Sequence, residues 1–177
     1  MSENQDGINR VSKEIKESCL RLLARREHSQ KELLNKLLVK GLAKDDILAV
    51  VEELALQGWQ SDLRYAESYA RHRIQKGYGP VSVAYELRQN GVDAVNLEDI
   101  VQQVAGSWME LLEQVYTKKY GHDLLMDRNE WAKRSRFLMQ RGFSGTMISA
   151  LFDHLNIKLQ GALHVPFQNH LYHEKND

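Results

Sequence analysis

The stretch "RIQKGYGPVSVAYELRQNGV", residues 73 to 92, predicts two helices separated by a tight turn. Pro80 suits the first turn of a helix, because its missing N–H would have no intrahelical partner there and its φ is already set for a helix. Gly91 suits the position just past a helix end, where the backbone turns left-handed and a Cβ is unfavourable. The stretch therefore holds the end of one helix, a turn and one complete short helix.

The same arrangement recurs at two other places in the chain. In each copy, a cation near the end of a first helix precedes a turn that holds a ring, and another helix begins directly afterwards. The aligned positions include Arg21 with Arg71, His28 with Tyr78, Lys76 with Arg141, Tyr78 with Phe143, Gly41 with Gly91, and Gly91 with Asn156. This internal match indicates a repeated unit of three helices.

Helical periodicity dominates from about Val11 onward, and the alternating runs typical of strands are hard to find. We therefore predict an all-α protein of three tandem three-helix repeats, with a further helix, "SWMELLEQVYTKKYG", opening the third. Such repeats bury their apolar faces on their neighbours, which gives an elongated, curved molecule. The expected boundaries are a disordered N-terminus at 1–10, repeats at 11–59, 60–106 and 107–157, and a flexible C-terminal tail at 158–177.

Composition narrows the class of protein. The 24 Lys and Arg residues balance 24 Asp and Glu residues, so the chain lacks the basic excess of a typical nucleic-acid-binding domain. The single cysteine, Cys19, excludes an internal disulfide and a multi-cysteine metal site, and its place on an apolar stripe predicts a buried, inert thiol. The polar N-terminus lacks the apolar core of a signal peptide, and no run is long enough to span a membrane. We expect a soluble cytoplasmic monomer.

Local groups of cations in repeats two and three are the candidate binding sites. The ordinary explanation of such groups is a solvated charged face. Their local excess in a neutral chain, and their recurrence at equivalent positions such as Arg71 and Arg136, favour instead a surface for an acidic partner or for phosphates. The candidate partner-binding residues are Arg71, Arg73, Lys76, Arg88, Arg134, Arg136 and Arg141.

Other residue patterns indicate neither catalysis nor a metal site. The paired acids Asp45 and Asp46 lie at a helix start, where the helix dipole explains them without acid–base chemistry. The clustered histidines His164, His170 and His173 fall in the expected flexible tail, where nothing orders them around a zinc ion. There is no phosphate-binding glycine loop. We predict no enzymatic activity, no metal and no cofactor.

Two features leave direct DNA binding as an alternative. Short helix, turn and helix recur as they do in helix-turn-helix modules, and Tyr78 and Phe143 could stack on bases. However, the second helix "PVSVAYELRQN" offers Arg88, Gln89 and Asn90 only near its end, and the net charge is zero. For the two rings, packing of the turn against the next helix is the favoured interpretation.

Three segments resemble a known family: "LLARREHSQKEL", "SDLRYAESYARHRIQKGYGPVSVAYELRQNGV" and "RSRFLMQRGFSG". They are similar, in the same order, to segments of the bacterial RecX regulatory proteins, the modulators of the RecA recombinase. The resemblance covers roughly residues 15 to 155. It implies three tandem three-helix repeats and a protein without catalytic activity that lies in the groove of RecA filaments and lowers ATP hydrolysis, strand exchange and co-protease activity. We also expect weak contact with single-stranded DNA. The N-terminal segment is short for the family and the tail after His154 departs from it, so the resemblance assigns no role to either end.

Overall fold

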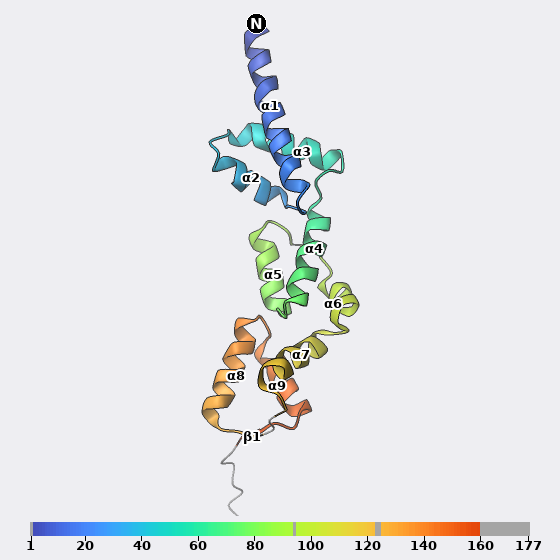
Figure 1. The fold of residues 1–177 in the computed structure, drawn as a ribbon, viewed down its shortest axis with the longest axis vertical. Coiled ribbons are helices and arrows are strands. Elements are labelled where there is room, and N and C mark those ends of the chain that lie inside the picture. The colour runs from blue at the N-terminus through green and yellow to red at the C-terminus, as the bar shows by residue number, and fades with distance from the viewer. Residues whose placement is uncertain (1, 94, 123–124, 160–177) are drawn as a thin grey trace, which may run out of the picture.

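Three groups of three helices follow one another along the long axis of the molecule (Figure 1). The computed structural model describes residues 2–93, 95–122 and 125–159. Within these ranges the expected all-α architecture of three tandem repeats, arranged as an elongated molecule, is confirmed. The helices are α1 (Ser2–Leu23), α2 (Gln30–Leu38) and α3 (Lys44–Leu56), then α4 (Asp62–Gln75), α5 (Pro80–Gln89) and α6 (Leu97–Ala105), then α7 (Trp108–Tyr120), α8 (Arg128–Gln140) and α9 (Gly145–His154).

The helix boundaries follow local signals in the sequence. The side chains of Ser29 and Ser107 accept hydrogen bonds from the backbone N–H of the third residue of α2 and of α7, so both act as N-caps. Pro80 is the first residue of α5. Gly91 and Asn156 follow helix ends with φ of 81° and 53°, which is the left-handed backbone expected at both positions. These stops turn the chain toward the next element, which is α6 after Gly91 and the segment leading to residues 158 and 159 after Asn156.

The first helix begins earlier than the sequence predicts. Residues 1–10 were expected to be disordered, but α1 starts at Ser2. The polar composition of this segment suggested disorder because it offers little apolar surface to bury. Extending a helix that is already formed adds one hydrogen bond for each residue fixed and avoids the cost of nucleation, so the helix continues into the polar segment.

A short pair of strands corrects the start of the expected C-terminal tail. Strand β2 (Lys158–Leu159) pairs in parallel with β1 (Leu125–Met126), so residues 158 and 159 belong to the third repeat. The left-handed backbone at Asn156 turns the chain after α9, and the neighbouring Ile157 is buried, which together bring these residues to β1. The rest of the expected tail lies outside the described residues.

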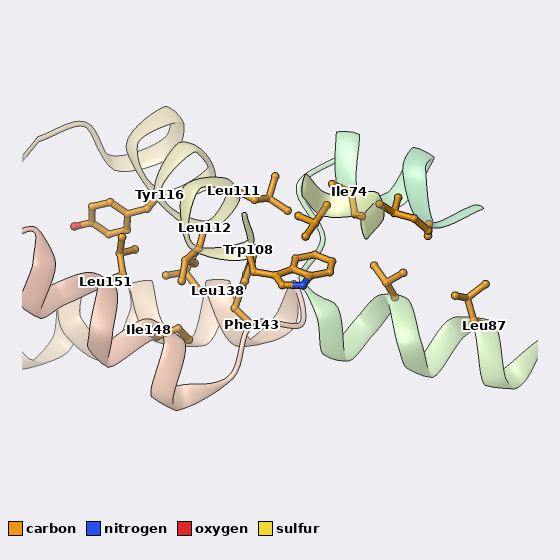
Figure 2. Packing of buried hydrophobic residues seen from close by; sticks show 14 of the residues in the cluster. Ile74, Leu87, Trp108, Leu111, Leu112, Tyr116, Leu138, Phe143, Ile148 and Leu151 are labelled. Atoms are coloured by element: carbon orange, nitrogen blue, oxygen red, sulfur yellow. The ribbon is translucent and has the colours of Figure 1, made fainter. Parts of the chain in front are cut away.

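Buried apolar side chains among the described residues form two separate cores. Repeat one has its own core, which includes Ile15, Leu37 and Leu54. Repeats two and three share a single core, in which Ile74 and Trp108 from opposite sides of the repeat boundary take part (Figure 2). Because the second core is continuous across the boundary, repeats two and three form one packed body.

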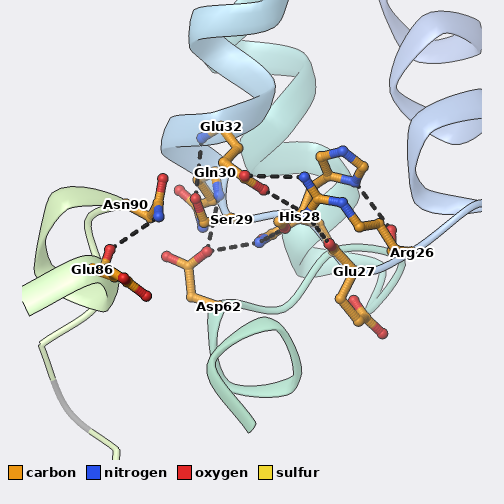
Figure 3. A network of polar contacts seen from close by, with 10 residues as sticks. Arg26, Glu27, His28, Ser29, Gln30, Glu32, Asp62, Glu86 and Asn90 are labelled. Carbon is orange, nitrogen blue, oxygen red and sulfur yellow. Dashed lines mark hydrogen bonds and ion pairs between the residues drawn. The ribbon is translucent and has the colours of Figure 1, made fainter. Parts of the chain in front are cut away.

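Repeat one meets repeat two through polar groups (Figure 3). The carboxylate of Asp62 accepts hydrogen bonds from the backbone N–H of Gln30 at 2.9 Å and from the side-chain amide of Gln60 at 2.8 Å. The amide of Gln60 also donates to the carbonyl oxygen of His28 at 3.1 Å. The joint between these repeats therefore depends on hydrogen bonds without a shared core, whereas repeats two and three also share an apolar core.

The buried position of Cys19 agrees with the expected inert thiol. Burial raises the pKa of this thiol to about 11, so it carries little thiolate at neutral pH. No helix in the described part of the chain is long and apolar enough to cross a membrane.

Candidate partner-binding site

Two equivalent turns, one in repeat two and one in repeat three, meet at the boundary between these repeats. The backbone N–H of Gly79 donates to the carbonyl oxygen of Arg141 at 2.7 Å, and that of Val81 donates to the carbonyl oxygen of Gly142 at 3.1 Å. The approach is too close for side chains, since a Cβ on Gly142 would lie 2.4 Å from the backbone nitrogen of Ser82. The repeated turn is thus the surface by which the repeats join.

Arg141 holds this junction together. Its Nη1 donates to the carbonyl oxygens of Lys76 at 2.9 Å and Gly77 at 3.3 Å, the two residues that directly follow α4. Its guanidinium also lies 5.4 Å from the ring centroid of Tyr78 and 5.0 Å from that of Phe137. A cation bound to the carbonyl end of a helix is favoured by the helix dipole. Arg141 therefore has a structural role, whether or not it contacts a partner.

Arg73 is also engaged inside the protein. Its Nη2 forms a short ion pair with Glu86 of α5, and its guanidinium lies 3.3 Å from the ring centroid of Tyr78. The hydroxyl of Tyr69 donates to the other oxygen of Glu86 at 2.9 Å, and burial together with this hydrogen bond raises the pKa of Tyr69 to about 12. These contacts fix α4 against α5.

Arg134 is buried, with 7% of its surface exposed. Its Nη1 donates to the hydroxyl of Tyr116 on α7 at 2.7 Å, and its Nε donates to Glu130 at 3.3 Å. Its guanidinium lies 4.8 Å from the ring centroid of Tyr120. This arginine ties α8 to α7 inside repeat three, so it is not available to a partner in this conformation.

The remaining four candidates are exposed. Arg71 donates to the side chain of Gln103 at 3.0 Å, which links α4 to α6. Lys76, Arg88 and Arg136 have no side-chain hydrogen bond or ion pair among the described residues. Of the seven predicted residues, the structure thus separates three that hold the fold from four that face solvent.

A basic cleft of about 480 Å³ lies at the boundary between repeats two and three. Four cations border it: Lys76 from the end of α4, Lys118 and Lys119 from the last turn of α7, and Arg141 from the end of α8. Its other lining residues are Gln75, Gly77, Leu111, Gln114, Val115 and Phe137, so no acid lines the cleft among the described residues.

The carbonyl ends of three helices converge at the cleft, and their negative partial charges stabilise some of these cations. Each carbonyl end carries roughly half a negative charge, so three ends offset between one and two of the four cations. An excess of roughly two to three positive charges remains, and Lys76, Lys118 and Arg141 form no ion pair within the described part of the chain. The cleft can therefore bind an anionic group of a partner.

The aromatic rings near the cleft are already covered. Phe143 is buried, Tyr78 has the guanidinium of Arg73 over its ring, and Phe137 has the ammonium of Lys119 at 3.4 Å from its centroid. Base stacking needs an open ring face. The placement of Tyr78 and Phe143 agrees with packing of the turn, which was the favoured interpretation.

In the part of the chain that the structure describes, no group of three or more His, Cys, Asp or Glu side chains lies close enough to hold a metal ion. The histidines His164, His170 and His173 lie outside the described residues.

Each repeat matches a family model. Residues 16–54 match "RecX, first three-helix domain", residues 61–99 match "RecX, second three-helix domain", and residues 109–152 match "RecX, third three-helix domain". The three matches occur in the family's order and together cover more than half of the chain. The chain belongs to the RecX family.

Curated RecX relatives cover most of the chain. The regulatory protein RecX of Legionella pneumophila (strain Corby) is 37% identical over 136 residues, which are 77% of this chain and 91% of the relative. That of Pseudomonas syringae pv. tomato is 36% identical over 139 residues, which are 78% of this chain and 90% of the relative. Both relatives are named regulatory proteins, and neither name includes an enzymatic activity.

Solved RecX structures share the fold. The crystal structure of RecX from Lactobacillus salivarius superposes with a TM-score of 0.67 at 23% identity, covering 85% of this chain and 99% of that one. Another crystal structure, of a regulatory protein RecX, gives a TM-score of 0.69 at 21% identity, covering 86% and 78% of the two chains. The tandem arrangement of repeats is therefore shared with experimental structures.

Sequence reasoning missed two cations of the cleft in this RecX family member, Lys118 and Lys119. They end α7, the helix that opens repeat three and has no counterpart before the first helices of the other repeats, so the internal alignment did not reach them. The pair of adjacent lysines in "VYTKKYG" was the available signal. Only the fold shows that they face Lys76 and Arg141 across one cleft.

Proposed function

We propose that the protein binds RecA nucleoprotein filaments and inhibits recombinase, ATPase and co-protease activities. Membership of the RecX family supports this proposal, because the RecX proteins that the chain resembles are modulators of RecA. The single structural observation that carries the mode of binding is the basic cleft between repeats two and three, with its excess of unpaired cations. The protein then acts as a regulator without catalysis, by occupying the filament.

The partner surface that suits this cleft is acidic. Cations that converge without acids repel one another, and an acidic group of the partner relieves that repulsion on binding. The exposed charges also attract a partner of opposite sign before contact, which raises the association rate at low salt. We therefore expect binding to weaken as the salt concentration rises.

Direct DNA binding is the weaker proposal. The exposed side of α5 has Val81 and Tyr85 ahead of Arg88, whereas a helix that reads the major groove places polar side chains at its N-terminal end. With the nearby rings covered, the cleft offers charge but no stacking platform. We propose that contact with single-stranded DNA is weak and falls with salt.

The test is RecA ATP hydrolysis on single-stranded DNA in the presence of two double variants. Lys76→Glu with Lys118→Glu reverses two cleft cations that have no side-chain partner among the described residues. Lys36→Glu with Lys40→Glu is the matched control, because both lysines lie at the end of α2 in repeat one and are exposed.

We expect the wild type and the control to slow ATP hydrolysis at sub-stoichiometric amounts, and the cleft variant to need at least about tenfold more protein for the same effect. Unchanged inhibition by the cleft variant would remove the cleft from the mode of binding. A wild type that leaves ATP hydrolysis unchanged would overturn the proposed function.

A further inference from the structure

The N-terminal end of α5 and the C-terminal end of α8 meet at the junction of repeats two and three (Figure 1). The N–H of Val81 donates to the carbonyl oxygen of Gly142, and the N–H of Gly142 donates to that of Met139, at 3.1 and 2.9 Å. The backbone of Gly142 is thus hydrogen-bonded to both Val81 and Met139. The ends of the two helices therefore adjoin there.

Exposed apolar side chains lie on both helices, at the junction or within one helical turn of it. Val81 and Tyr85, one helical turn apart on α5, are each 56% exposed, and Met139 of α8 is 52% exposed. Val81 and Tyr85 make no contribution to the shared core, and their exposure costs hydrophobic free energy in the free protein. Tyrosine, methionine and arginine are enriched at the centres of protein interfaces.

Arginines flank the apolar residues at both ends. Arg88 lies seven residues after Val81, on the same side of α5, and Arg136 lies three residues before Met139 on α8. Both are exposed and have no ion pair within the described residues. The exposed positions of α5 and α8 carry no acid, since Glu86 and Glu130 are half-buried and already paired with cations. We call Val81, Tyr85, Arg88, Arg136 and Met139 the α5–α8 ridge.

We infer that the α5–α8 ridge is a protein-docking surface whose partner presents an apolar hollow bordered by acidic side chains. The inference rests on the proposed function, in which that partner is the RecA filament. Tyr85 and Met139 are the anchors that fill the hollow. Arg88 and Arg136 pair with its acidic border and fix the orientation of the protein on its partner. The ridge is distinct from the basic cleft, because its residues do not line the cleft.

Charge argues against a second copy of this chain as the occupant. In a twofold contact the same surface appears on both sides, so each residue meets its own copy or another member of the ridge. The ridge offers two arginines and no acid, and such a contact would place cation against cation. Nucleic acid fits poorly as well, because the apolar centre offers nothing to phosphates.

The test measures binding to RecA filaments assembled on single-stranded DNA with a non-hydrolysable nucleotide. Tyr85→Ala and Met139→Ala remove the anchors, and Trp59→Ala is the matched control, since Trp59 is 60% exposed and lies outside the ridge. Arg136→Glu tests the charge, and Arg128→Glu is its control, because Arg128 is exposed on the same helix about two turns away. Circular dichroism and thermal melts confirm that each variant is folded.

We expect Tyr85→Ala to weaken binding at least about tenfold, and Arg136→Glu to weaken it mainly at low salt, while both controls stay within about twofold of the wild type. Equal binding by Tyr85→Ala and the wild type would overturn this inference and leave the proposed function standing. No binding by the wild type would overturn both.

Two further measurements exclude the other occupants. Sedimentation of the wild type alone should give a monomer, and a dimer that Tyr85→Ala dissolves would assign the ridge to self-association. Binding to bare single-stranded DNA should be the same for Tyr85→Ala and the wild type, and a tenfold loss there would assign the ridge to nucleic acid. Either result would overturn the inference.

Discussion

The backbone N–H of Gly79 lies 2.7 Å from the carbonyl oxygen of Arg141, so equivalent turns of repeats two and three are hydrogen-bonded directly to each other. The contact brings backbone against backbone. A Cβ on Gly79 would lie 2.5 Å from the carbonyl oxygen of Gly142, which is closer than real Cβ atoms approach. The glycines of the repeated turn therefore shape the boundary between the repeats as well as the turn itself.

Gly142→Ala should destabilise the protein strongly. Gly142 has φ of 87°, and a Cβ there would lie 2.4 Å from the backbone nitrogen of Ser82. The left-handed backbone alone costs an alanine about 1–2 kcal/mol, and the clash with backbone atoms adds to that cost. Denaturant unfolding measures the loss. The control is Gly145→Ala, where a Cβ meets nothing within 4 Å and the position is helical. Similar stability of the two variants would contradict the close contact.

Charge reversal should divide the predicted arginines into two classes. Arg73→Glu places a carboxylate beside Glu86, and Arg141→Glu removes the donor to two helix-end carbonyls, so each should lower the free energy of unfolding by at least about 2 kcal/mol. Arg88→Glu and Arg136→Glu change exposed, unpaired side chains and should alter it by less than about 0.5 kcal/mol. Thermal melts of the four single variants provide the comparison. Equal melting temperatures throughout would remove the structural role of Arg73 and Arg141.

The sequence predicted the start of α5 and the ends of α5 and α9 because the causes of these boundaries are local. Pro80 at a helix start and Asn156 in a left-handed position act through their own backbone, so a repeat alignment was enough to find them. The burial of cations is decided by neighbouring elements. Arg73 and Lys76 are three residues apart on the same helix, yet Arg73 is half-buried against α5 and Lys76 is exposed. Spacing placed them on one side of the helix but did not show what that side contacts.

Weakening the core of repeat one should leave repeats two and three intact. Leu37 is fully buried in the core of repeat one, and its replacement by alanine should cost about 2–5 kcal/mol. Because that core is separate from the shared one, hydrogen exchange should accelerate in α1 to α3 much more than in α4 to α9. Leu112→Ala in the shared core is the matched control and should accelerate exchange in both repeats two and three. Uniform acceleration across all three repeats in Leu37→Ala would contradict the separation of the cores.

The buried His28 should make stability fall as the pH drops below about 6.5. Burial lowers the pKa of His28, even though its Nδ1 lies 3.0 Å from the carbonyl oxygen of Arg26. The unfolded chain titrates near pH 6.5, so below that pH it binds a proton that the folded protein does not. Stability is therefore fully present above about pH 6.5 and falls as the pH drops, by at most about 1.4 kcal/mol per pH unit, until the pH passes below the folded pKa. Carboxylates with lowered pKa values, such as Glu53 and Glu130, lose their contribution only below about pH 5, outside this window.

His28→Asn isolates this effect, because the asparagine amide can still donate to the carbonyl oxygen of Arg26 but does not titrate. The variant should be less stable at pH 7, since it loses the packing of a buried ring, but its stability should change less between pH 7 and 5 than that of the wild type. Urea unfolding at half-unit pH steps measures the slope. His72→Asn is the control, because His72 is exposed, and it should keep the wild-type slope. A slope that persists in His28→Asn would assign the pH dependence to other groups. A flatter dependence of stability on pH would place the proton-sensitive group at the polar joint between repeats one and two. There the carbonyl oxygen of His28 accepts a hydrogen bond from the side-chain amide of Gln60.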